Sequence, residues 1–443
     1  IIDMGLTPGV EVTLIKTAPM GAPLEIRLRG YELTLRKADA SKIVVTDIHD
    51  TNTCPRINSR FQNIEHSKLG ETRTYPTRKL SNAIFKTKLR FALAGNQNCG
   101  KTTLFNKLTG SHQHVGNFPG VTVDRTEGFV NGNKNYIITD LPGIYSLSPY
   151  SSEEIITRNF ILNEKPDGII NIIDATNIER NLLLTMQLIE LDVPMVIALN
   201  MMDEVEASGG AIDINGLEAT LGVPVVPISA SKGQGIEELV EHAINVAKYN
   251  EHPGRLDFCD ANVENEKSVH KCIHSLIHLI EDEAKFNNIP VRFAATKLAE
   301  DDSLIKQTFN FDNNKLATIE KIVCEMEKER GLDRQAAIAD SRFSFIERLC
   351  ANFVQKEEES PSRRITNNID KILTGKYTAF VAFLLIMSLI FYFTFGPVGT
   401  FLSDLMEYVI DYGTDFVNYM LTAYGLNPVV KSLIIDGIFA GVC

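Results

Sequence analysis

The residue pattern with the clearest chemical meaning lies near position 100. Residues 95–102 follow the spacing G-x-x-x-x-G-K-[ST], with Gly95, Gly100, Lys101 and Thr102 at the defined positions. The glycines let backbone N–H groups surround phosphate oxygens, the lysine neutralises phosphate charge, and the threonine hydroxyl is a ligand for Mg²⁺. An apolar run precedes the pattern and a helical pattern follows it, as a phosphate-binding loop requires. The sequence therefore predicts a nucleotide site here.

Two shorter motifs supply further groups for phosphate and metal. Residues 120–122 are Gly-Val-Thr, and Thr122 can cap Mg²⁺ and sense a γ-phosphate. Residues 140–143 are Asp-Leu-Pro-Gly after an apolar run, so Asp140 can hold Mg²⁺ through water while the N–H of Gly143 meets the γ-phosphate. Each motif alone could be an ordinary loop or turn, but their order along the chain supports the nucleotide site.

Two later motifs point to guanine as the base. Residues 200–203 are Asn-Met-Met-Asp, and a carboxylate at Asp203 can accept two hydrogen bonds from guanine N1–H and N2–H₂, which adenine does not offer. Residues 229–231 are Ser-Ala-Ser, and the N–H of Ala230 could reach the guanine O6. Together the motifs predict a GTPase rather than an ATPase.

The predicted site is a set of residues drawn from all five motifs. Its nucleotide contacts are Gly95, Asn96, Gln97, Asn98, Cys99, Gly100, Lys101, Thr102, Thr103, Gly120, Val121, Thr122, Asp140, Leu141, Pro142, Gly143, Asn200, Met201, Met202, Asp203, Ser229, Ala230 and Ser231. The predicted catalytic residues are Lys101, Thr122, Asn98 and Gly143, and the predicted Mg²⁺ ligands are Thr102, Thr122 and Asp140.

The spacing of the motifs leaves open which residues orient water and supply extra positive charge. Many GTPases have a glutamine directly after the DxxG glycine, but this chain has Ile144, which cannot orient water. Asn98 lies inside the phosphate loop, where its carbonyl oxygen could bind a monovalent cation such as K⁺ beside the phosphates. The alternative is that Asn98 only stabilises the loop through backbone hydrogen bonds, and spacing leaves both interpretations open.

The elements that must position these motifs form an α/β domain over residues 88–250. Short apolar runs at 89–94, 137–140, 168–174, 194–200 and 223–229 alternate with helical patterns, including 178–191 and 236–249. This alternation predicts a mostly parallel sheet covered on both faces. Ligands bind such sheets at the carboxyl ends of the strands, where the polar motifs lie.

The flanking regions predict three further parts. Residues 1–46 contain strand patterns at 10–15, 24–28 and 31–35 and predict a small, incomplete β-barrel, and residues 47–87 predict a solvated linker. Residues 251–370 predict a polar helical domain. On its helical pattern, His270, His274 and His278 share one face and could ligate a metal or simply pack against a neighbouring helix.

The C-terminal part predicts a membrane domain. Residues 377–402 contain no charged side chain, and a helix of about 20 apolar residues spans a bilayer, so we expect a first span at about 377–398. Basic residues precede this span and acidic residues follow it, which places residues 1 to about 376 in the cytoplasm. An amphipathic segment follows at 405–421, and residues 371–443 would begin a polytopic domain. The sequence begins inside a strand-and-turn pattern and ends inside an apolar stretch, so we expect a fragment truncated at both ends.

Bulk properties narrow the class further. A chain of 443 residues is too long for a single hydrophobic core, so we expect several domains. The net charge of −12 argues against a nucleic-acid partner. The seven scattered cysteines suit a reducing cytosol. Membrane lipid is the expected partner of the apolar span. A weaker alternative, a ribosome-linked soluble GTPase, is opposed by that span and by the acidic balance.

The motif set resembles a known family. Residues 95–103, 116–123, 140–146, 174–182 and 200–203 are similar to the ferrous iron transport protein B (FeoB) family, and residues 1–46, with Met-Gly-Leu-Thr-Pro-Gly at 4–9, resemble its partner FeoA, an SH3-like barrel. The resemblance implies a plasma-membrane Fe²⁺ uptake system with FeoA fused in cis and a helical domain that tunes nucleotide binding. It also implies K⁺-stimulated hydrolysis assisted by Asn98 and a switch role for Thr122. Gln97 and Cys99 depart from common family residues, whereas Met201 replaces the lysine of many GTPases, a change that the family tolerates.

Two function classes remain after this comparison of motifs. The first is a GTPase that drives or gates Fe²⁺ passage, with GTP or GDP, Mg²⁺ and K⁺ as cofactors and Fe²⁺ as cargo. The second is a membrane-tethered regulatory GTPase that acts on a protein partner. A homo-oligomer is an open alternative for either class.

Overall fold

The computed structural model describes residues 2–17, 23–48, 88–110, 113–118, 124–131, 133–254, 256–259, 264–355 and 378–423. It also describes the single residues 369, 425, 427, 433 and 435. The chain divides into two compact units, one from residue 1 to 17 and 23 to 360, the other from 18 to 22 and 361 to 443. Nearly all of the predicted linker, and the basic residues predicted to flank the membrane span, lie outside the described residues.

A seven-stranded mixed sheet forms the centre of the first unit. Its order is β11-β9-β8-β4-β7-β6-β5, and the strands are β4 (Leu89–Gly95), β5 (Gln113–Asn117), β6 (Asp124–Val130), β7 (Asn133–Asp140), β8 (Gly168–Asp174), β9 (Met195–Asn200) and β11 (Val225–Pro227). The five strands predicted from apolar runs are parallel, as expected. The antiparallel strands β5 and β6, of which β5 lies at the edge of the sheet, were not predicted, because their sequences are mostly polar.

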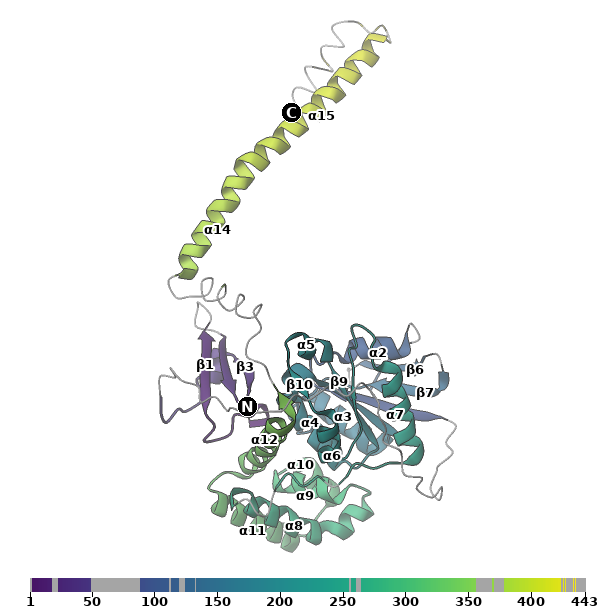
Figure 1. The fold of residues 1–443 in the computed structure, drawn as a ribbon, viewed down its shortest axis with the longest axis vertical. Coiled ribbons are helices and arrows are strands. Elements are labelled where there is room, and N and C mark those ends of the chain that lie inside the picture. The colour runs from purple at the N-terminus through teal and green to yellow at the C-terminus, as the bar shows by residue number, and fades with distance from the viewer. Residues whose placement is uncertain are drawn as a thin grey trace. The chain divides into compact units, whose positions relative to one another are not determined.

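Helices cover both faces of this sheet, as Figure 1 shows. Along β4, Phe91 and Leu93 enter one apolar cluster with α2 (Lys101–Thr109) and α7 (Ile236–Tyr249). The alternate residues Ala92 and Ala94 enter a second cluster on the opposite face, because successive side chains of a strand point to opposite faces. The helices of the GTPase domain that contribute to this second cluster are α3 (Ser152–Asn159), η2 (Phe160–Glu164), η3 (Ala175–Asn177), α4 (Ile178–Glu190), α5 (Met202–Ala207) and α6 (Ile214–Leu221).

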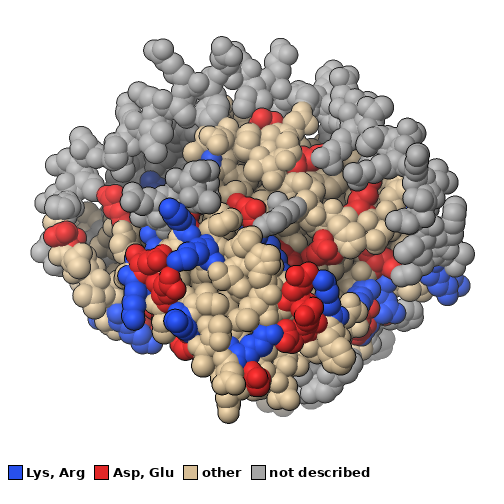
Figure 2. Space-filling model, turned by 90° about the horizontal axis from the view of Figure 1, so that it is seen from below, with Lys and Arg blue, Asp and Glu red and all other residues tan. Residues whose placement is uncertain are grey.

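The predicted helical domain packs on that second face. It contains α8 (Glu264–Phe286), α9 (Val291–Ala299), α10 (Ser303–Phe309), α11 (Asn313–Arg330) and α12 (Arg334–Phe353), and a short pairing of β10 (Ala211–Ile212) with β12 (Val354–Gln355) ties its end to the GTPase domain. Asp302, Asp312 and Asp333 accept hydrogen bonds from the first backbone N–H groups of α10, α11 and α12, which fixes where these helices begin. Figure 2, which views the molecule from below, shows acidic and basic side chains interspersed on that face.

The N-terminal region is β-rich, as predicted. Its described residues form the antiparallel sheet β1-β2-β3, with β1 (Val12–Thr17), β2 (Leu24–Leu28) and β3 (Tyr31–Leu35), preceded by η1 (Ile2–Met4) and followed by α1 (Lys37–Ala40). Both β2 and β3 match the predicted ranges, while β1 begins two residues later than expected. The apolar side chains of alternate positions form one small core.

The second unit contains the predicted apolar helix. Helix α14 (Thr378–Phe395) is followed by α15 (Pro397–Ala423), which includes the amphipathic segment predicted at 405–421. Among the described residues, this stretch is long and apolar enough to cross a membrane by length and composition, with a mean hydropathy of 2.3 over its most apolar window.

Candidate nucleotide-binding site

The phosphate-binding loop lies between the end of β4 and the start of α2, as its sequence predicts. Gly100 has a φ of +91°, and a Cβ there would lie 2.3 Å from Nδ2 of Asn200. A Cβ on Gly95 would lie 2.5 Å from Cγ2 of Ile172 on the neighbouring strand β8. Both positions therefore require glycine, because the loop approaches the adjacent strand ends too closely for a side chain.

Lys101 and Asp140 lie together at the carboxyl edge of the sheet. The Lys101 Nζ lies 2.6 Å from Oδ1 of Asp140, and both side chains are largely buried. Burial raises the pKa of Asp140, although the charge and hydrogen bond of Lys101 oppose that shift. Thr102 is exposed in the first turn of α2. The structure thus brings the predicted phosphate lysine and the predicted Mg²⁺ carboxylate to one place.

The DxxG segment lies against the phosphate loop. Nε2 of Gln97 donates to the carbonyl of Gly143 at 3.4 Å, and the N–H of Ile144 donates to the carbonyl of Gly95 at 3.3 Å. Leu141 and Ile144 are buried in the apolar cluster under α4. The side chain that follows the DxxG glycine therefore serves the core of the domain.

Asn200 connects three of the predicted motifs. Its Nδ2 donates to the carbonyl of Cys99 in the phosphate loop at 2.9 Å, and its Oδ1 accepts the N–H of Ala230 at 2.9 Å. The N–H of Ala230, which the sequence analysis assigned to guanine O6, is therefore bonded to Asn200 here. One buried amide fixes the spacing between the phosphate loop and the base-recognition motifs.

Asp203 lies in the first turn of α5, after Met201 in the left-handed conformation with φ of +63°. Its carboxylate lies 3.1 Å from Nζ of Lys232. The hydrogen bond from Lys232 lowers the pKa of Asp203, so the carboxylate is an ionised acceptor at neutral pH. Beside it, the hydroxyls of Ser229 and Ser231 lie 3.2 Å apart.

The remaining residues of the phosphate loop differ in their surroundings. Asn98 is exposed and has a φ of +64°, a conformation that asparagine tolerates better than most residues. Asn96 is buried, and its Nδ2 donates to the carbonyl of Arg180 at 3.4 Å. Burial raises the pKa of Cys99 to about 12, which keeps it a neutral thiol. The backbone of Asn98 fits a structural role, and its side chain is exposed.

Two sets of predicted residues stand apart from this geometry. Gly120, Val121 and Thr122 lie outside the described residues. The rings of His270, His274 and His278 lie along α8 with centroids 6.0 and 4.6 Å apart. Within the part of the chain that the structure describes, no group of three or more His, Cys, Asp or Glu side chains could hold a metal ion.

The residues of α4 that support the DxxG segment were not predicted from the sequence. The guanidinium of Arg180 lies over the ring of Tyr145, 4.3 Å from its centroid. Oε1 of Gln187 accepts the N–H of Leu147. Arg180 lies within the family-like stretch at 174–182, whereas Gln187 had no sequence indication, because a helix residue that stabilises a distant loop has no local motif.

A mixed sheet that brings a phosphate loop, a DxxG segment and a base-recognition carboxylate to one edge defines a P-loop GTPase domain. Family profiles match three parts of the chain: ferrous iron transport protein B at residues 89–243, the FeoB cytosolic helical domain at 266–355, and the FeoA domain at 1–47. The chain belongs to the FeoB family, with a FeoA domain at its N-terminus.

Individual relatives agree with this assignment. An Fe(2+) transport protein A/Fe(2+) transporter FeoB fusion protein of Porphyromonas gingivalis is 34% identical over 469 residues, covering 100% of this chain and 54% of the relative. The Fe(2+) transporter FeoB of Staphylococcus aureus strain COL is 35% identical over 355 residues, covering 80% and 52%. The chain therefore spans about half the length of the curated relatives it matches.

Solved structures match the GTPase and helical parts. A GDP-bound mutant of the S. thermophilus FeoB G-domain is 39% identical with a TM-score of 0.55, covering 60% of this chain and 100% of that one. The S. thermophilus protein bound to GDP.AlF4- and K+ is 40% identical with a TM-score of 0.52, covering 59% and 99%.

Proposed function

We propose that this chain binds GTP and hydrolyses it to GDP and phosphate. The observation that carries the proposal is the Asn200 bridge, because it holds the phosphate loop and the base-recognition segment at one edge of the sheet. Lys101 would neutralise the β- and γ-phosphates, and Gly143 would offer its N–H to the γ-phosphate. Asp203 would accept the two guanine hydrogen bonds. The full predicted set of contact residues belongs to this proposal.

The residues at the phosphate edge fit Mg²⁺, a cation that prefers oxygen ligands. The exposed hydroxyl of Thr102 and the carboxylate of Asp140, which lies within reach of Lys101, would hold it, with Thr122 as a third ligand. When bound, Mg²⁺ would neutralise charge that develops on the phosphate oxygens. The side chain of Asp140 is directed to this edge by its position at the end of β7.

The proposal includes a K⁺ site at Asn98. Its exposed side chain in the phosphate loop could place a carbonyl oxygen on a monovalent cation beside the phosphates. A related G-domain has been solved with GDP.AlF4- and K+, which supports a K⁺ site in this chain. Because Ile144 is buried, the attacking water would be oriented by backbone groups and not by a glutamine after DxxG.

The wider role that we propose is in Fe²⁺ uptake. The relatives are named Fe(2+) transporters, and the apolar stretch in the second unit suits a plasma-membrane span with residues 1 to about 376 in the cytoplasm. In this proposal residues 1–46, 88–250, 251–370 and 371–443 are the FeoA-like, GTPase, helical and membrane parts, joined by a linker at 47–87. The names of the relatives favour this role over a regulatory GTPase with a protein partner.

GTP turnover by the whole chain in detergent tests the nucleotide part. We expect faster turnover in K⁺ than in Na⁺ at equal ionic strength, and loss of that difference in Asn98→Ala. Asn131→Ala is the matched control, because Asn131 also has a positive φ but lies outside the phosphate loop. Equal rates of the wild type in both salts would remove the K⁺ proposal, and an absence of turnover would remove the GTPase proposal.

Uptake of radioactive Fe²⁺ by cells that express the natural gene tests the transport part. Asp203→Asn should abolish GTP-dependent uptake, since it removes the negative acceptor for guanine. Uptake that continues at the wild-type rate in this variant would separate transport from GTP binding and would favour a regulatory role.

A further inference from the structure

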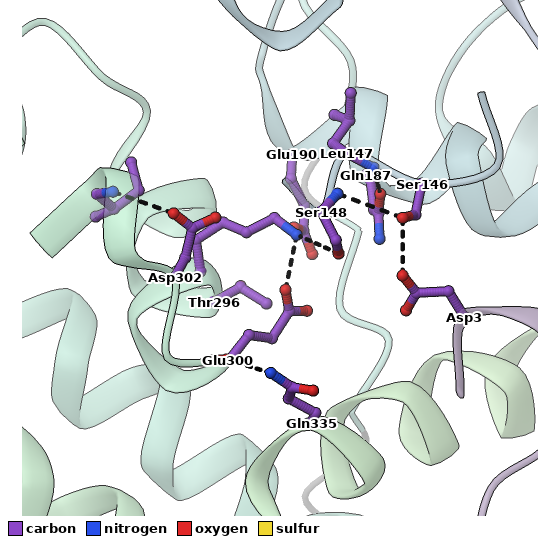
Figure 3. Close-up of polar contacts among 12 residues, drawn as sticks. Asp3, Ser146, Leu147, Ser148, Gln187, Glu190, Thr296, Glu300, Asp302 and Gln335 are labelled. Carbon is purple, nitrogen blue, oxygen red and sulfur yellow. Dashed lines mark hydrogen bonds and ion pairs between the residues drawn. The ribbon is translucent and has the colours of Figure 1, made fainter. Parts of the chain in front are cut away.

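The segment that follows the DxxG motif is contacted by polar groups from other parts of the chain, as Figure 3 shows. The hydroxyl of Ser146 donates to the carboxylate of Asp3 at 2.8 Å and accepts the N–H of Ser148 at 3.3 Å. The N–H of Leu147 donates to Oε1 of Gln187 on α4. All three residues of the segment are buried, so these bonds are shielded from competition by water.

The helical domain contributes the third contact. Nζ of Lys297 on α9 donates to the hydroxyl of Ser148 at 3.3 Å and forms an ion pair of 2.7 Å with Glu300. The Lys297 side chain is 0% exposed, and Arg342 on α12 pairs with both Glu300 and Glu190. The ammonium of Lys297 therefore has a fixed position, because its carboxylate partner, Glu300, is also paired with Arg342.

The N-terminal domain holds Asp3 with similar support. Asp3 lies in η1, whose last residue, Met4, accepts a hydrogen bond from the hydroxyl of Tyr31 at 2.6 Å. The guanidinium of Arg29 donates to the carbonyl of Gly5 at 3.2 Å. Tyr31 at the start of β3 and Arg29 of the turn before it thus hold the backbone directly after Asp3, whose carboxylate accepts the hydrogen bond of Ser146.

Arg29 also attaches this domain to α12. Its guanidinium lies 2.8 Å from Asp340 and 2.7 Å from Glu347, and it lies over the ring of Phe343 at 5.3 Å from the centroid. The Arg29 side chain is 7% exposed. Helix α12 consequently carries both the anchor of the N-terminal domain and Arg342 of the network around Lys297.

We propose that Ser146–Ser148 is a coupling site at which the N-terminal domain and the helical domain jointly position the DxxG glycine. The segment begins three residues after Gly143, whose carbonyl is bonded to Gln97 of the phosphate loop. A chain of contacts runs from Asp3 through Ser146 and Ser148 to Lys297, so either domain changes the position of the same three residues. This inference rests on the proposed GTPase function.

The coupling has a defined effect on nucleotide preference. In the proposed site the N–H of Gly143 meets only the γ-phosphate, so a loosened segment weakens the binding of a triphosphate and leaves GDP unaffected. Loss of one buried hydrogen bond corresponds to about a 3- to 10-fold change in an equilibrium constant. Because Asp3 and Ser148 act through one segment, losing both contacts changes the preference hardly more than losing one.

The test is a double-mutant cycle in the whole chain in detergent. Dissociation constants for GDP and for a non-hydrolysable GTP analogue are measured for Asp3→Ala, Ser148→Ala and the double variant. We expect each single variant to lower the preference for the analogue by about 3- to 10-fold, and the double variant to fall within about twofold of the larger single effect. Ser146→Thr keeps the hydroxyl and should resemble the wild type, whereas Ser146→Ala should resemble Asp3→Ala.

Asp39→Ala is the matched control, because Asp39 is an exposed carboxylate of the same domain that pairs with Lys42 at 3.7 Å. Unchanged nucleotide preference in all the variants, with lower thermal stability alone, would show a purely structural role and overturn the proposal. If the effects of the two substitutions multiply in the double variant, the claim that Asp3 and Ser148 act through one segment would be overturned. If the wild type binds no guanine nucleotide, the proposed function fails first and the coupling site with it.

Discussion

The nucleotide edge and the interdomain network use polar side chains in opposite ways. At the edge, Asn98 and Thr102 are exposed, and the carboxylate of Asp203 has an exposed lysine as its ion-pair partner. The interdomain network comprises Arg158, Glu190, Lys297, Glu300, Asp302 and Arg342. In it, Arg158 and Asp302 form an ion pair of 2.5 Å with side chains 3% and 2% exposed.

This difference separates binding from assembly. Asn98 and Thr102 of the phosphate loop and the helix after it are left accessible, and the left-handed conformation of Asn98 shows that backbone geometry sets its position. Polar groups that join two domains are paired with each other and excluded from water, so removing one partner leaves a buried charge. Substitutions in the network should therefore reduce stability, while substitutions at the edge should reduce nucleotide affinity.

The largest effect is expected for Asp302→Ala. The substitution leaves the guanidinium of Arg158 unpaired in the interior and removes the acceptor at the start of α10. We expect a loss of about 3–5 kcal/mol in the free energy of unfolding, measured by urea unfolding followed by circular dichroism. Glu281→Ala is the control, because Glu281 pairs with Lys285 on the exposed surface and should unfold with an unchanged midpoint. Equal effects of the two variants would contradict the comparison.

The second prediction concerns the loss of folding stability at low pH. Burial alone would raise the pKa of Glu300, but the charges of Lys297 and Arg342 lower it from 4.5 to about 2. A carboxyl whose pKa is lower in the folded state stabilises the fold above its unfolded pKa, and this stability is lost as the pH falls from about 4.5 to about 2. The contribution is about 3 kcal/mol, since a pKa difference of one corresponds to about 1.4 kcal/mol.

Urea unfolding of the wild type and of Glu300→Gln at several pH values measures this contribution. The two proteins should differ most above pH 5, and the difference should shrink steadily toward pH 2.5. A difference that stays constant with pH would mean that Glu300 is not ionised in the folded network.

At the nucleotide edge, Lys101→Met should leave the fold intact and reduce kcat/KM for GTP by about 100-fold or more, since it removes the principal positive charge at the phosphates. Lys107→Met is the control on the same helix, because Lys107 is exposed and points away from the buried face of α2. A stability loss in Lys101→Met comparable to that of Asp302→Ala would contradict the division of roles.

Contiguous motifs allowed most of the nucleotide edge to be predicted. The residues of the phosphate loop are neighbours in sequence, and strands such as β8 are apolar runs bounded by polar residues, so local patterns reveal them. The antiparallel strands β5 and β6 were missed because the residues that pair them are mostly polar. The network was missed because its ion pairs join residues such as Arg158 and Asp302, 144 positions apart, and no local pattern encodes such a contact.

The most direct test of the account is the choice of base by the whole chain. Isothermal calorimetry with GDP and ADP should give at least about 1,000-fold tighter binding of GDP, and Asp203→Asn should lose most of that preference, because a carboxylate left without its hydrogen-bond partners disfavours adenine. Equal affinity of the wild type for GDP and ADP would contradict the assignment of this edge as a guanine-nucleotide site.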